Sequence, residues 1–332
     1  MILSSTDRRV TISDAATPSR TTTRRKFLAK LGAGLAIPAF VRSSALGLAG
    51  SVPPSDRIAM GLIGCGIHGA GWNLDQMFAN PQQQVVALCD VDSEHLAQAA
   101  ARVAEHHSQQ GGVAKPCALF ADFRDLINRP DIDAVDVVTP DHWHVIPALM
   151  ALRAGKHVIC EKPLSLTVSE GRLLADEAAR AGRVFQTASE NRSIDSYIQI
   201  CELVRAGFIG ELQHIKVLLE RGNAGRGNED FRIQEPPPSL NYELWQGQAP
   251  ETHYCPARVH NTYRWNLAYS GGPITDWGAH LIDLAQWASG NERTGPVSVE
   301  GVGKFPPADS IWNTAEDFDL HYEYANRVTM HV

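Results

Sequence analysis

Two acids bracket one histidine in the segment Gly271–Asp283. Asp276 precedes His280 by four residues, and Asp283 follows His280 by three. Residues three or four apart lie on one face of a helix, so a helix here would place both carboxylates beside the imidazole. Histidine titrates near neutral pH and can accept a proton from a hydroxyl group. The spacing fits an acid/base site, part of a metal site, or a polar stripe on a half-exposed helix.

A lysine in the run Cys160-Glu161-Lys162-Pro163 is a second candidate for chemistry. It leaves a predicted strand, and the proline that follows restricts where it points. An ammonium group there can hold the oxygen of a reacting carbinol and favour its alkoxide form. The alternative is a surface lysine. The bond before Pro163 is a candidate for the cis form.

A glycine pattern of the form GxGxxG follows the predicted strand Ile58–Ile63 directly and opens a helix. Its glycines allow a tight turn, close approach of a pyrophosphate and packing of helix on strand. Asp90 ends the next predicted strand, where a carboxylate accepts ribose hydroxyls and repels a 2′-phosphate. We therefore predict that NAD, rather than NADP, binds to Gly64, Gly66, Ile67, His68, Gly69 and Asp90. A tight turn without a ligand, and a helix cap, are the alternatives.

Two further segments follow strands at the same predicted sheet edge, where ligands bind in such folds. The first is the run TPDHWH, from which we predict that Thr139, Pro140 and His144 contact the cofactor. The second contributes Glu161 and Lys162 to the same set. The pair His142 and His144 resembles a metal motif, but two histidines alone are a weak signal, and we predict no metal.

The chain from Ile58 to Gln186 alternates short β-rich runs with helix-length amphipathic segments. This alternation predicts an α/β fold with a doubly wound parallel sheet covered on both faces. The expected strands are Ile58–Ile63, Val85–Cys89, Cys117–Phe120, Ala134–Val138, His157–Cys160 and Val184–Gln186. The expected helices include Ser93–His106, Val145–Ala154 and Val168–Ala181.

After Gln186 the pattern changes to that of an α+β domain with a mostly antiparallel open sheet. We expect helices at Tyr197–Ala206 and Ile274–Ala288, and a strand at Gln213–Leu219. The irregular stretch Arg221–Arg264 between them is long enough to suggest a functional loop. Strand-like segments complete the chain, the last being His321–Val332. Because the sequence stops within this strand, we expect the second domain to be incomplete at its C-terminus.

The first 50 residues resemble a twin-arginine export signal. Arg24 and Arg25 precede the modest apolar run Leu31–Val41, which is too short to span a bilayer, and small residues follow. A disordered tail with a chance arginine pair is the alternative. The predicted organisation is an export segment and linker over 1–50, a Rossmann domain over 56–187 and a substrate-binding domain over 188–332. The predicted location is periplasmic or otherwise extracytoplasmic.

Charge and cysteine usage narrow the possible partners. The formal net charge is -7, and the first 50 residues carry eight Lys/Arg against two Asp, so the remainder is more acidic still. An acidic body argues against nucleic acid as a partner. The six cysteines form no CxxC pair, and we expect them to be buried apolar residues rather than a disulfide framework.

Taken together, these motifs resemble the Gfo/Idh/MocA oxidoreductases, the family of glucose–fructose oxidoreductase and inositol dehydrogenase. The resemblance runs from Arg57 to the end and rests on the GxGxxG, TPDHWH, AGKHV-CEKP, QTASENRS and GGPITDWGAHLIDLAQW segments. It implies that Lys162, Asp276 and His280 form the catalytic group. From the helix spacing alone, we expect Asp283, one turn further on, to support this group. The resemblance also implies a homo-oligomer for the full-length form. The chain differs from the family in stopping early.

The implied activity is hydride transfer between tightly bound NAD and a secondary hydroxyl or ketone of a sugar, cyclitol or glycoside. An NAD-dependent glycosidase or lyase that acts by transient oxidation is the alternative; a non-catalytic NAD-binding protein is a further one. Sugars are bound by planar polar groups and aromatic faces, which Trp245, Trp265 and Trp277 could supply. The predicted substrate-binding residues are Glu190, Arg192, Arg258, His260, Arg264 and Trp277, with Asn191 and Tyr263 as neighbours.

Overall fold

The computed structural model describes residues 52–109, 116–220 and 229–332. The predicted export segment lies outside these residues. Val52–Val332 form one compact unit. No helix among the described residues has the length and apolar character needed to cross a membrane. The domain boundaries expected at residues 56, 187 and 188 stay predictions.

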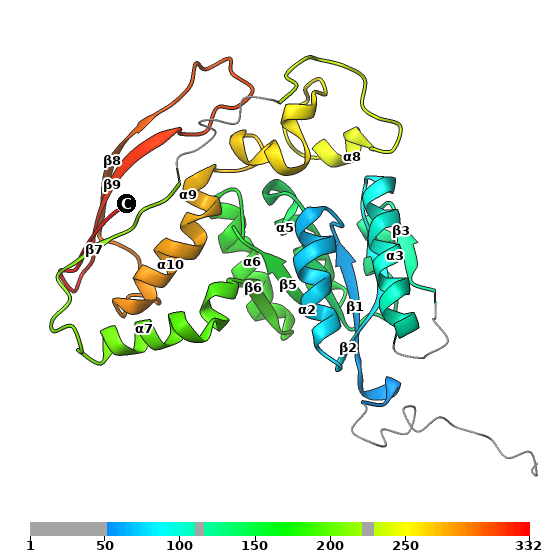
Figure 1. Cartoon of the computed structure of the whole chain (residues 1–332), viewed down its shortest axis with the longest axis horizontal. Helices are drawn as coiled ribbons and strands as arrows, with labels where there is room; N and C mark the ends of the chain where they lie inside the picture. Colours follow the sequence, from blue (N-terminus) through cyan, green and yellow to red (C-terminus); the bar gives the residue numbers. More distant parts are fainter. Residues whose placement is uncertain (1–51, 110–115, 221–228) are drawn as a thin grey trace, which may run out of the picture. The chain divides into compact units, whose positions relative to one another are not determined.

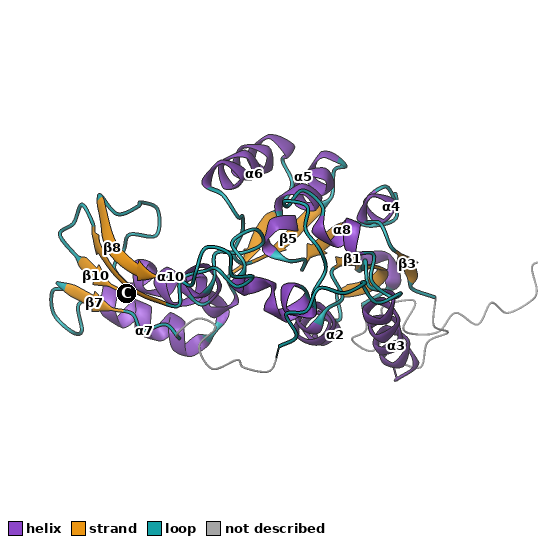
Figure 2. Cartoon of the chain, turned by 90° about the horizontal axis from the view of Figure 1, so that it is seen from above, coloured by secondary structure: helices purple, strands orange, loops and turns teal. Residues whose placement is uncertain are grey.

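The first sheet has six parallel strands in the order β3-β2-β1-β4-β5-β6 (Figures 1 and 2). This is the strand order of the dinucleotide-binding fold, in which the strand order reverses between the neighbouring parallel strands β1 and β4. The strands are β1 Ile58–Ile63, β2 Gln83–Cys89, β3 Ala118–Phe120, β4 Ala134–Val137, β5 His157–Glu161 and β6 Phe185–Ala188.

Helices cover both faces of this sheet, as the apolar strands require. The π-helical turn η4, the helices α2 and α3 and one set of strand side chains enclose a buried cluster that includes Leu62 and Leu74. On the other face α4, α5 and α6 enclose a cluster that includes Val135 and Leu152. The helices are η4 Gly69–Asn73, α2 Leu74–Ala79, α3 Ser93–Gln109, α4 Phe123–Ile127, α5 Val145–Arg153 and α6 Val168–Ala181.

Local signals explain where these helices begin and end. The side chain of Thr167 accepts a hydrogen bond from the backbone of Glu170, whose carboxylate accepts one from the Thr167 backbone in return. Gly182 then ends α6 in the left-handed conformation. The parallel sheet with helices on both faces confirms the expected α/β class and the doubly wound sheet.

The second part contains a four-stranded sheet in the order β7-β10-β9-β8, in which the β7–β10 pair is parallel and the other pairs are antiparallel. The expected mostly antiparallel sheet is thus confirmed. α10 packs its apolar side on this sheet around Met330 and Tyr324. The elements are α7 Asp195–Arg205, β7 His214–Lys216, α8 Tyr242–Gln246, α9 Pro273–Asp276, α10 Gly278–Ala288, β8 Ser298–Lys304, β9 Asp317–Glu323 and β10 Thr329–His331.

Two expected elements are divided in the structure. The helix predicted over 274–288 is interrupted at Trp277, where the backbone N–H of His280 reaches the Trp277 carbonyl three residues back. The strand expected over 321–332 is two strands, because a turn in which Arg327 has a φ of 67° separates β9 from β10. The spacing of apolar residues in the sequence predicts neither the interruption of the helix nor the turn between the strands.

Residues 239–265, called here the crossing segment, lie against the first sheet's domain. The backbone N–H of Ser93 donates to the Ser239 carbonyl, and that of Asn241 donates to Val91. Further along, the indole N–H of Trp143 donates to the Trp245 carbonyl at 2.9 Å. The short helices α8, η7 (Pro256–Arg258) and η8 (His260–Trp265) order this predicted irregular stretch.

Candidate active site

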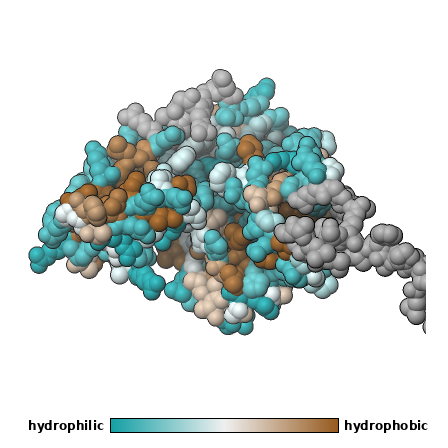
Figure 3. All heavy atoms as spheres, turned by 60° about the horizontal axis from the view of Figure 1, so that its bottom comes forward, coloured by the Kyte–Doolittle hydropathy of each residue, from teal (hydrophilic) through white to brown (hydrophobic). Residues whose placement is uncertain are grey.

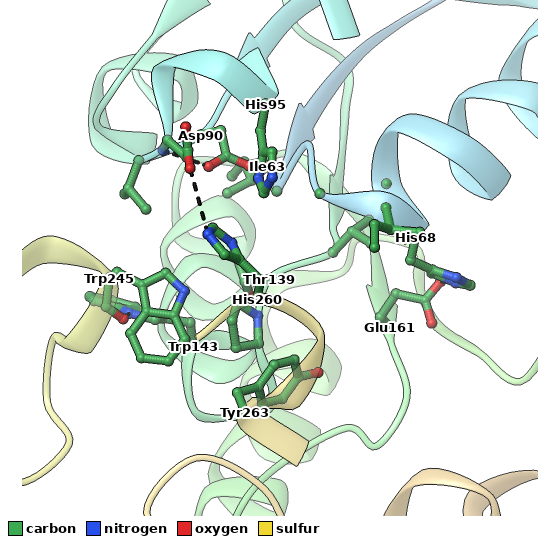
Figure 4. A pocket seen from close by; sticks show the side chains of 18 of the residues that line it. Ile63, His68, Asp90, His95, Thr139, Trp143, Glu161, Trp245, His260 and Tyr263 are labelled. Carbon is green, nitrogen blue, oxygen red and sulfur yellow. Dashed lines mark hydrogen bonds and ion pairs between the residues drawn. The ribbon is translucent and has the colours of Figure 1, made fainter. Parts of the chain in front are cut away.

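A cavity of about 460 Å³ lies at the carboxyl edge of the parallel sheet. Its wall combines the glycine turn after β1, the ends of β2, β4 and β5, and the crossing segment. Figure 4 shows Asp90 and His95 toward one end and His68 with Glu161 toward the other. Of the predicted cofactor-binding residues, the cavity lining includes Gly64, Gly66, Ile67, His68, Gly69, Asp90, Thr139, Pro140, His144, Glu161 and Lys162.

The glycine turn can fold this tightly against β4 only because side chains are absent. Gly64 has a φ of 98°, and a Cβ there would lie 2.4 Å from the Val138 carbonyl oxygen. A Cβ on Gly69 would lie 2.0 Å from the Gly64 oxygen. Near Gly64, the buried Oγ1 of Thr139 has no hydrogen-bond partner in the described structure. This cradle and the orphaned hydroxyl fit the pyrophosphate and polar groups of a dinucleotide.

Asp90 is already engaged with the backbone around the turn. Its Oδ2 accepts a hydrogen bond from the Cys65 N–H at 2.6 Å, and its Oδ1 accepts one from the Asp92 N–H at 2.7 Å. Burial raises the pKa of Asp90, while these hydrogen bonds lower it in part. Each carboxylate oxygen still has a lone pair free for a ribose hydroxyl.

A buried acidic network supports the strand end that carries Lys162. Asn73 donates to both Asp136, at 3.0 Å, and Glu161, at 3.1 Å. His68 adds a contact to Glu161 at 3.2 Å. Burial acts to raise the pKa of Glu161, but the His68 contact and the other hydrogen bonds outweigh it and lower the pKa. Burial raises the pKa of Asp136 to about 7. Glu161 therefore serves as an ionised anchor beneath the cavity.

Lys162 joins the two halves of the site. Its Nζ lies 2.6 Å from Oδ1 of Asp276, and the Nε of Arg264 lies 3.4 Å from Oδ2 of the same carboxylate. Burial would raise the pKa of Asp276, but the Lys162 and Arg264 charges outweigh it and hold the pKa below its usual value. The peptide bond from Lys162 to Pro163 is cis, as expected. The site thus holds an ammonium group, a guanidinium group and a carboxylate together.

His280 lies near this group with one nitrogen unsatisfied. The side chain is buried, its Nδ1 has no hydrogen-bond partner in the described structure, and its Nε2 lies 3.8 Å from Oε1 of Glu190. Burial lowers the pKa of His280, and the charge of Lys162 lowers it further. A neutral imidazole with a free nitrogen is a competent proton acceptor.

The two histidines of TPDHWH bind backbone carbonyls. The Nδ1 of His144 lies 2.7 Å from the Pro163 oxygen, and its Nε2 lies 2.8 Å from the Thr139 oxygen. His144 therefore links the two strand-end loops at the cavity wall. The Nε2 of His142 faces the Trp245 carbonyl at 3.1 Å, and burial lowers the pKa of His142 to about 4.

The predicted substrate-binding residues divide into two groups. His260 and Arg264 line the cavity, and Glu190 lies beside His280. Arg192, in contrast, binds Asp283 through two hydrogen bonds of 2.6 and 2.7 Å and covers the ring of Trp287. That geometry gives Arg192 and Asp283 a structural use, and their roles toward substrate stay predictions.

Arg258 and the three candidate tryptophans differ in their exposure to solvent. Arg258 is partly buried beside Tyr269. Trp245 and Trp265 are buried, although Trp245 borders the cavity, whereas Trp277 is 45% exposed and lies 5.8 Å from the His280 ring. Of the three, Trp277 is the most exposed, and Trp245 lines the cavity.

Sequence reasoning missed Trp72, Asn73 and Asp141, although it named Tyr263 as a neighbour of the substrate-binding residues. Trp72 lines it from η4 and is 48% exposed. Tyr263 donates its hydroxyl to the buried Asp141 at 2.8 Å, which positions the neighbouring Arg264. Asp141 stands in the TPDHWH run, so its place could have been inferred. The contacts of Asn73 depend on strands distant in sequence and left no local signal.

Two models of one oxidoreductase family match most of the chain. One, described as an NAD-binding Rossmann fold, matches residues 58–189, and the other, described as a C-terminal alpha/beta domain, matches residues 199–329. The matched regions cover the glycine turn, Lys162, Asp276 and His280.

Curated relatives include a protein of Shewanella pealeana named as a glycosyl hydrolase family 109 protein, 31% identical over 166 residues. That match covers 49% of this chain and 35% of the relative. An uncharacterized oxidoreductase of Rhizobium meliloti is 32% identical over 48% of this chain and 45% of its own length. The matched region spans less than half the length of these relatives.

Solved structures share the fold at low sequence identity. An aldose-aldose oxidoreductase from Caulobacter crescentus gives a TM-score of 0.58 at 22% identity, over 83% of this chain and 70% of that one. An NAD-binding protein from Listeria innocua gives a TM-score of 0.59 at 21% identity, over 83% of this chain and 64% of that one.

Proposed function

Because the chain belongs to the Gfo/Idh/MocA oxidoreductase family, whose first domain binds NAD, we propose that it oxidises or reduces a carbinol carbon of a sugar, cyclitol or glycoside. The observation that carries this proposal is the 2.6 Å contact of Asp276 with Lys162, which lines the cavity. It brings an ammonium donor from the first domain together with a carboxylate from the second.

Lys162 and His280 have different roles toward the substrate oxygen: Lys162 donates hydrogen bonds to it, and His280 accepts its proton. The Lys162 ammonium has three N–H donors, of which one faces Asp276 and two are free to hold a hydroxyl or carbonyl oxygen. The neutral imidazole of His280 accepts the hydroxyl proton as the alcohol is oxidised and returns it in the reverse direction. Bound NAD supplies the hydride acceptor or donor.

Asp276 and Arg264 keep this arrangement in place. The Asp276 carboxylate directs the Lys162 ammonium through one oxygen, while Arg264 contacts its second oxygen. Trp277 offers an exposed aromatic face to a sugar ring, and Glu190 offers an acceptor for its hydroxyls. Sugar-dehydrogenase names among the structural neighbours, such as levoglucosan dehydrogenase, are consistent with this substrate class.

The test is a panel of sugars, cyclitols and glycosides added to the purified full chain, with the absorbance of reduced nicotinamide as the readout. We expect at least one compound to reduce the bound cofactor, and Lys162→Ala to slow this reduction by about 10²- to 10³-fold while NAD stays bound. A Lys162→Ala protein with full activity contradicts the assignment.

A second candidate is glycoside cleavage by transient oxidation. The names of several curated relatives as glycosyl hydrolase family 109 proteins favour it. Oxidation beside a C–H bond acidifies that bond, so elimination and hydration can release the aglycone with no net NADH. A nitrophenyl glycoside distinguishes the two reactions, because aglycone release without lasting cofactor reduction supports cleavage.

We also propose that the protein is exported by the twin-arginine route with its cofactor already loaded. The pattern around Arg24 and Arg25 supports this route. Since no NAD pool exists outside the cytoplasm, a retained cofactor is what such a location requires. Replacing both arginines by lysine should keep the protein in the cytoplasm on fractionation, and unchanged export contradicts the proposal.

Self-association is the expected assembly. Figure 3 shows hydrophobic side chains gathered in patches on one face. Along α7 and the turn after it, Ile200, Leu203, Phe208 and Ile209 are exposed. Exposed apolar groups of this kind favour association with a second copy. Sedimentation of the full chain and of a Phe208→Ser variant tests this expectation.

A further inference from the structure

The geometry points to a site for a divalent transition-metal ion of the zinc class, formed by Asp92, His95 and His260. One ligand atom from each residue lies within 4.8 Å of the other two. Two imidazoles and one carboxylate form a ligand set that suits zinc and its spectroscopic substitute Co²⁺. All three residues line the cavity described above, but none takes part in the proposed proton transfer, so metal binding can be measured without measuring that reaction.

Asp92 supplies a carboxylate whose direction is already fixed. The residue is 5% exposed, and its Oδ1 accepts a hydrogen bond from the Glu94 N–H at 2.9 Å, at the start of α3. Its Oδ2 is turned toward the Nε2 of His260 at 3.7 Å. Two ligands of a tetrahedral zinc ion stand about 3.4 Å apart, given bonds of about 2.1 Å. The pair is therefore spaced for a shared ion rather than for a direct hydrogen bond.

His260 reaches this position through an uncommon backbone conformation. Its φ is 52°, in the left-handed region that residues other than glycine rarely adopt. Such conformations gather at functional sites and persist where the surroundings hold them. The ring of His260 meets that of His95 at an edge, with centroids 4.7 Å apart and planes at 62°. The strained residue thus directs its imidazole toward the other two candidate ligands.

The three ligands come from both sides of the cavity. Asp92 and His95 lie at the corner between β2 and α3, whereas His260 belongs to the crossing segment. Figure 4 shows His95 and His260 approaching the same end of the cavity. An ion held there would join the crossing segment to the first domain beside Asp90. Three protein ligands would leave a fourth position open to water or another oxygen ligand.

One other cluster of this composition occurs among the described residues, and it makes a useful contrast. The Nε2 atoms of His321 and His331 lie 2.8 and 3.1 Å from one oxygen of Asp319, on an exposed face of the second sheet. The two imidazoles already make hydrogen-bond contacts with that carboxylate. This cluster carries no proposal, but it must be disabled when the first one is tested.

The experiment uses the full chain carrying His321→Ala, stripped of metal with a chelator and titrated with Co²⁺. We expect one Co²⁺ per chain, with the intense visible absorption of tetrahedral coordination. Adding His260→Gln or His95→Gln should remove that absorption. Adding His107→Gln, at the other end of α3, should leave it unchanged and serves as the matched control.

Circular dichroism and the thermal unfolding of each variant show that the chain has remained folded. Elemental analysis of protein purified without chelator provides an independent count of bound zinc. The proposal is overturned if the His321→Ala protein binds no Co²⁺. It is equally overturned if His260→Gln and His95→Gln bind Co²⁺ as well as the His107→Gln control does.

Discussion

The Nζ of Lys162 and Oδ1 of Asp276 lie 2.6 Å apart, although 114 residues separate them in the sequence. Lys162 directly follows β5 of the parallel sheet, and Asp276 ends α9. Both side chains are largely buried, with exposed fractions of 11% and 15%. The contact therefore depends on the correct placement of the second domain against the first.

Lys162→Ala should lower kcat by about 10²- to 10³-fold, since it removes one donor to the developing oxygen anion. Asp276→Asn should have a smaller effect, because the amide still accepts a hydrogen bond from Lys162 but no longer neutralises its charge. The measurement is single-turnover reduction of bound NAD. Lys304→Ala, at an exposed lysine, is the control and should match the wild type. Equal activity in all three variants would remove Lys162 from the mechanism.

The rate of alcohol oxidation should follow the ionisation of His280. Burial, with the Lys162 charge, lowers the pKa of His280 below its ordinary value of 6.5. Its basic form therefore dominates at neutral pH, and the rate should fall only as the pH drops through that lowered pKa. A pH profile of single-turnover oxidation measures this limb. His280→Ala should flatten the limb as well as slow the reaction, and a limb that survives the substitution belongs to another group.

Asp136→Asn should make the protein more resistant to unfolding above neutral pH. Burial raises the pKa of Asp136 from 3.8 to about 7, so the folded state keeps a proton that the unfolded chain releases. Stability from this group is complete below about pH 4, falls as the pH rises toward 7, and is constant above it. The asparagine imitates the protonated acid and avoids a loss of the order of a few kcal/mol.

Urea denaturation at pH 4.5 and pH 8 measures this difference. The midpoint of Asp136→Asn should exceed that of the wild type mainly at the higher pH. Asp56→Asn, at an exposed aspartate, should show no such dependence. A variant that is less stable than the wild type at both pH values shows that the buried carboxylate is needed as an anion.

Arg192→Lys should reduce stability and leave substrate affinity unchanged. The guanidinium makes two hydrogen bonds to Asp283, a geometry that an ammonium group cannot reproduce. Because both side chains are about a third exposed, the loss should be close to 1 kcal/mol. Thermal unfolding and KM are measured together. A higher KM at unchanged stability would instead place Arg192 among the substrate ligands.

Much of the first domain was accessible from the sequence. Strand β1 and helix α6 have the predicted bounds, because a buried apolar run and a capping box are local signals. The glycine turn after β1 was also predicted, because only glycine, which has no side chain, fits such a tight turn. The cavity edge followed from the rule that ligands bind at the carboxyl ends of parallel strands.

The rest required contacts between distant residues. Nothing near Arg192 indicates that Asp283 will occupy it, and nothing near Lys162 fixes its distance to Asp276. The interruption at Trp277 lies inside a continuous helical pattern, and the dihedral angles of Trp277 are themselves helical. His260 owes its place to a backbone conformation that no propensity predicts. The sequence therefore predicted which residues belong to the candidate site, but not the distances and backbone conformations that bring them together.

Part of the attachment of the crossing segment uses its own main-chain atoms. The Ser239 carbonyl accepts from the Ser93 N–H, the Asn241 N–H donates to Val91, and the Trp245 carbonyl accepts from the Trp143 indole. Side chains that take no part in these contacts and are not buried can therefore change over evolutionary time while the path of the segment stays the same. New ligand preferences could arise there by drift in side chains alone, with the cofactor cradle and the Lys162–Asp276 pair inherited unchanged.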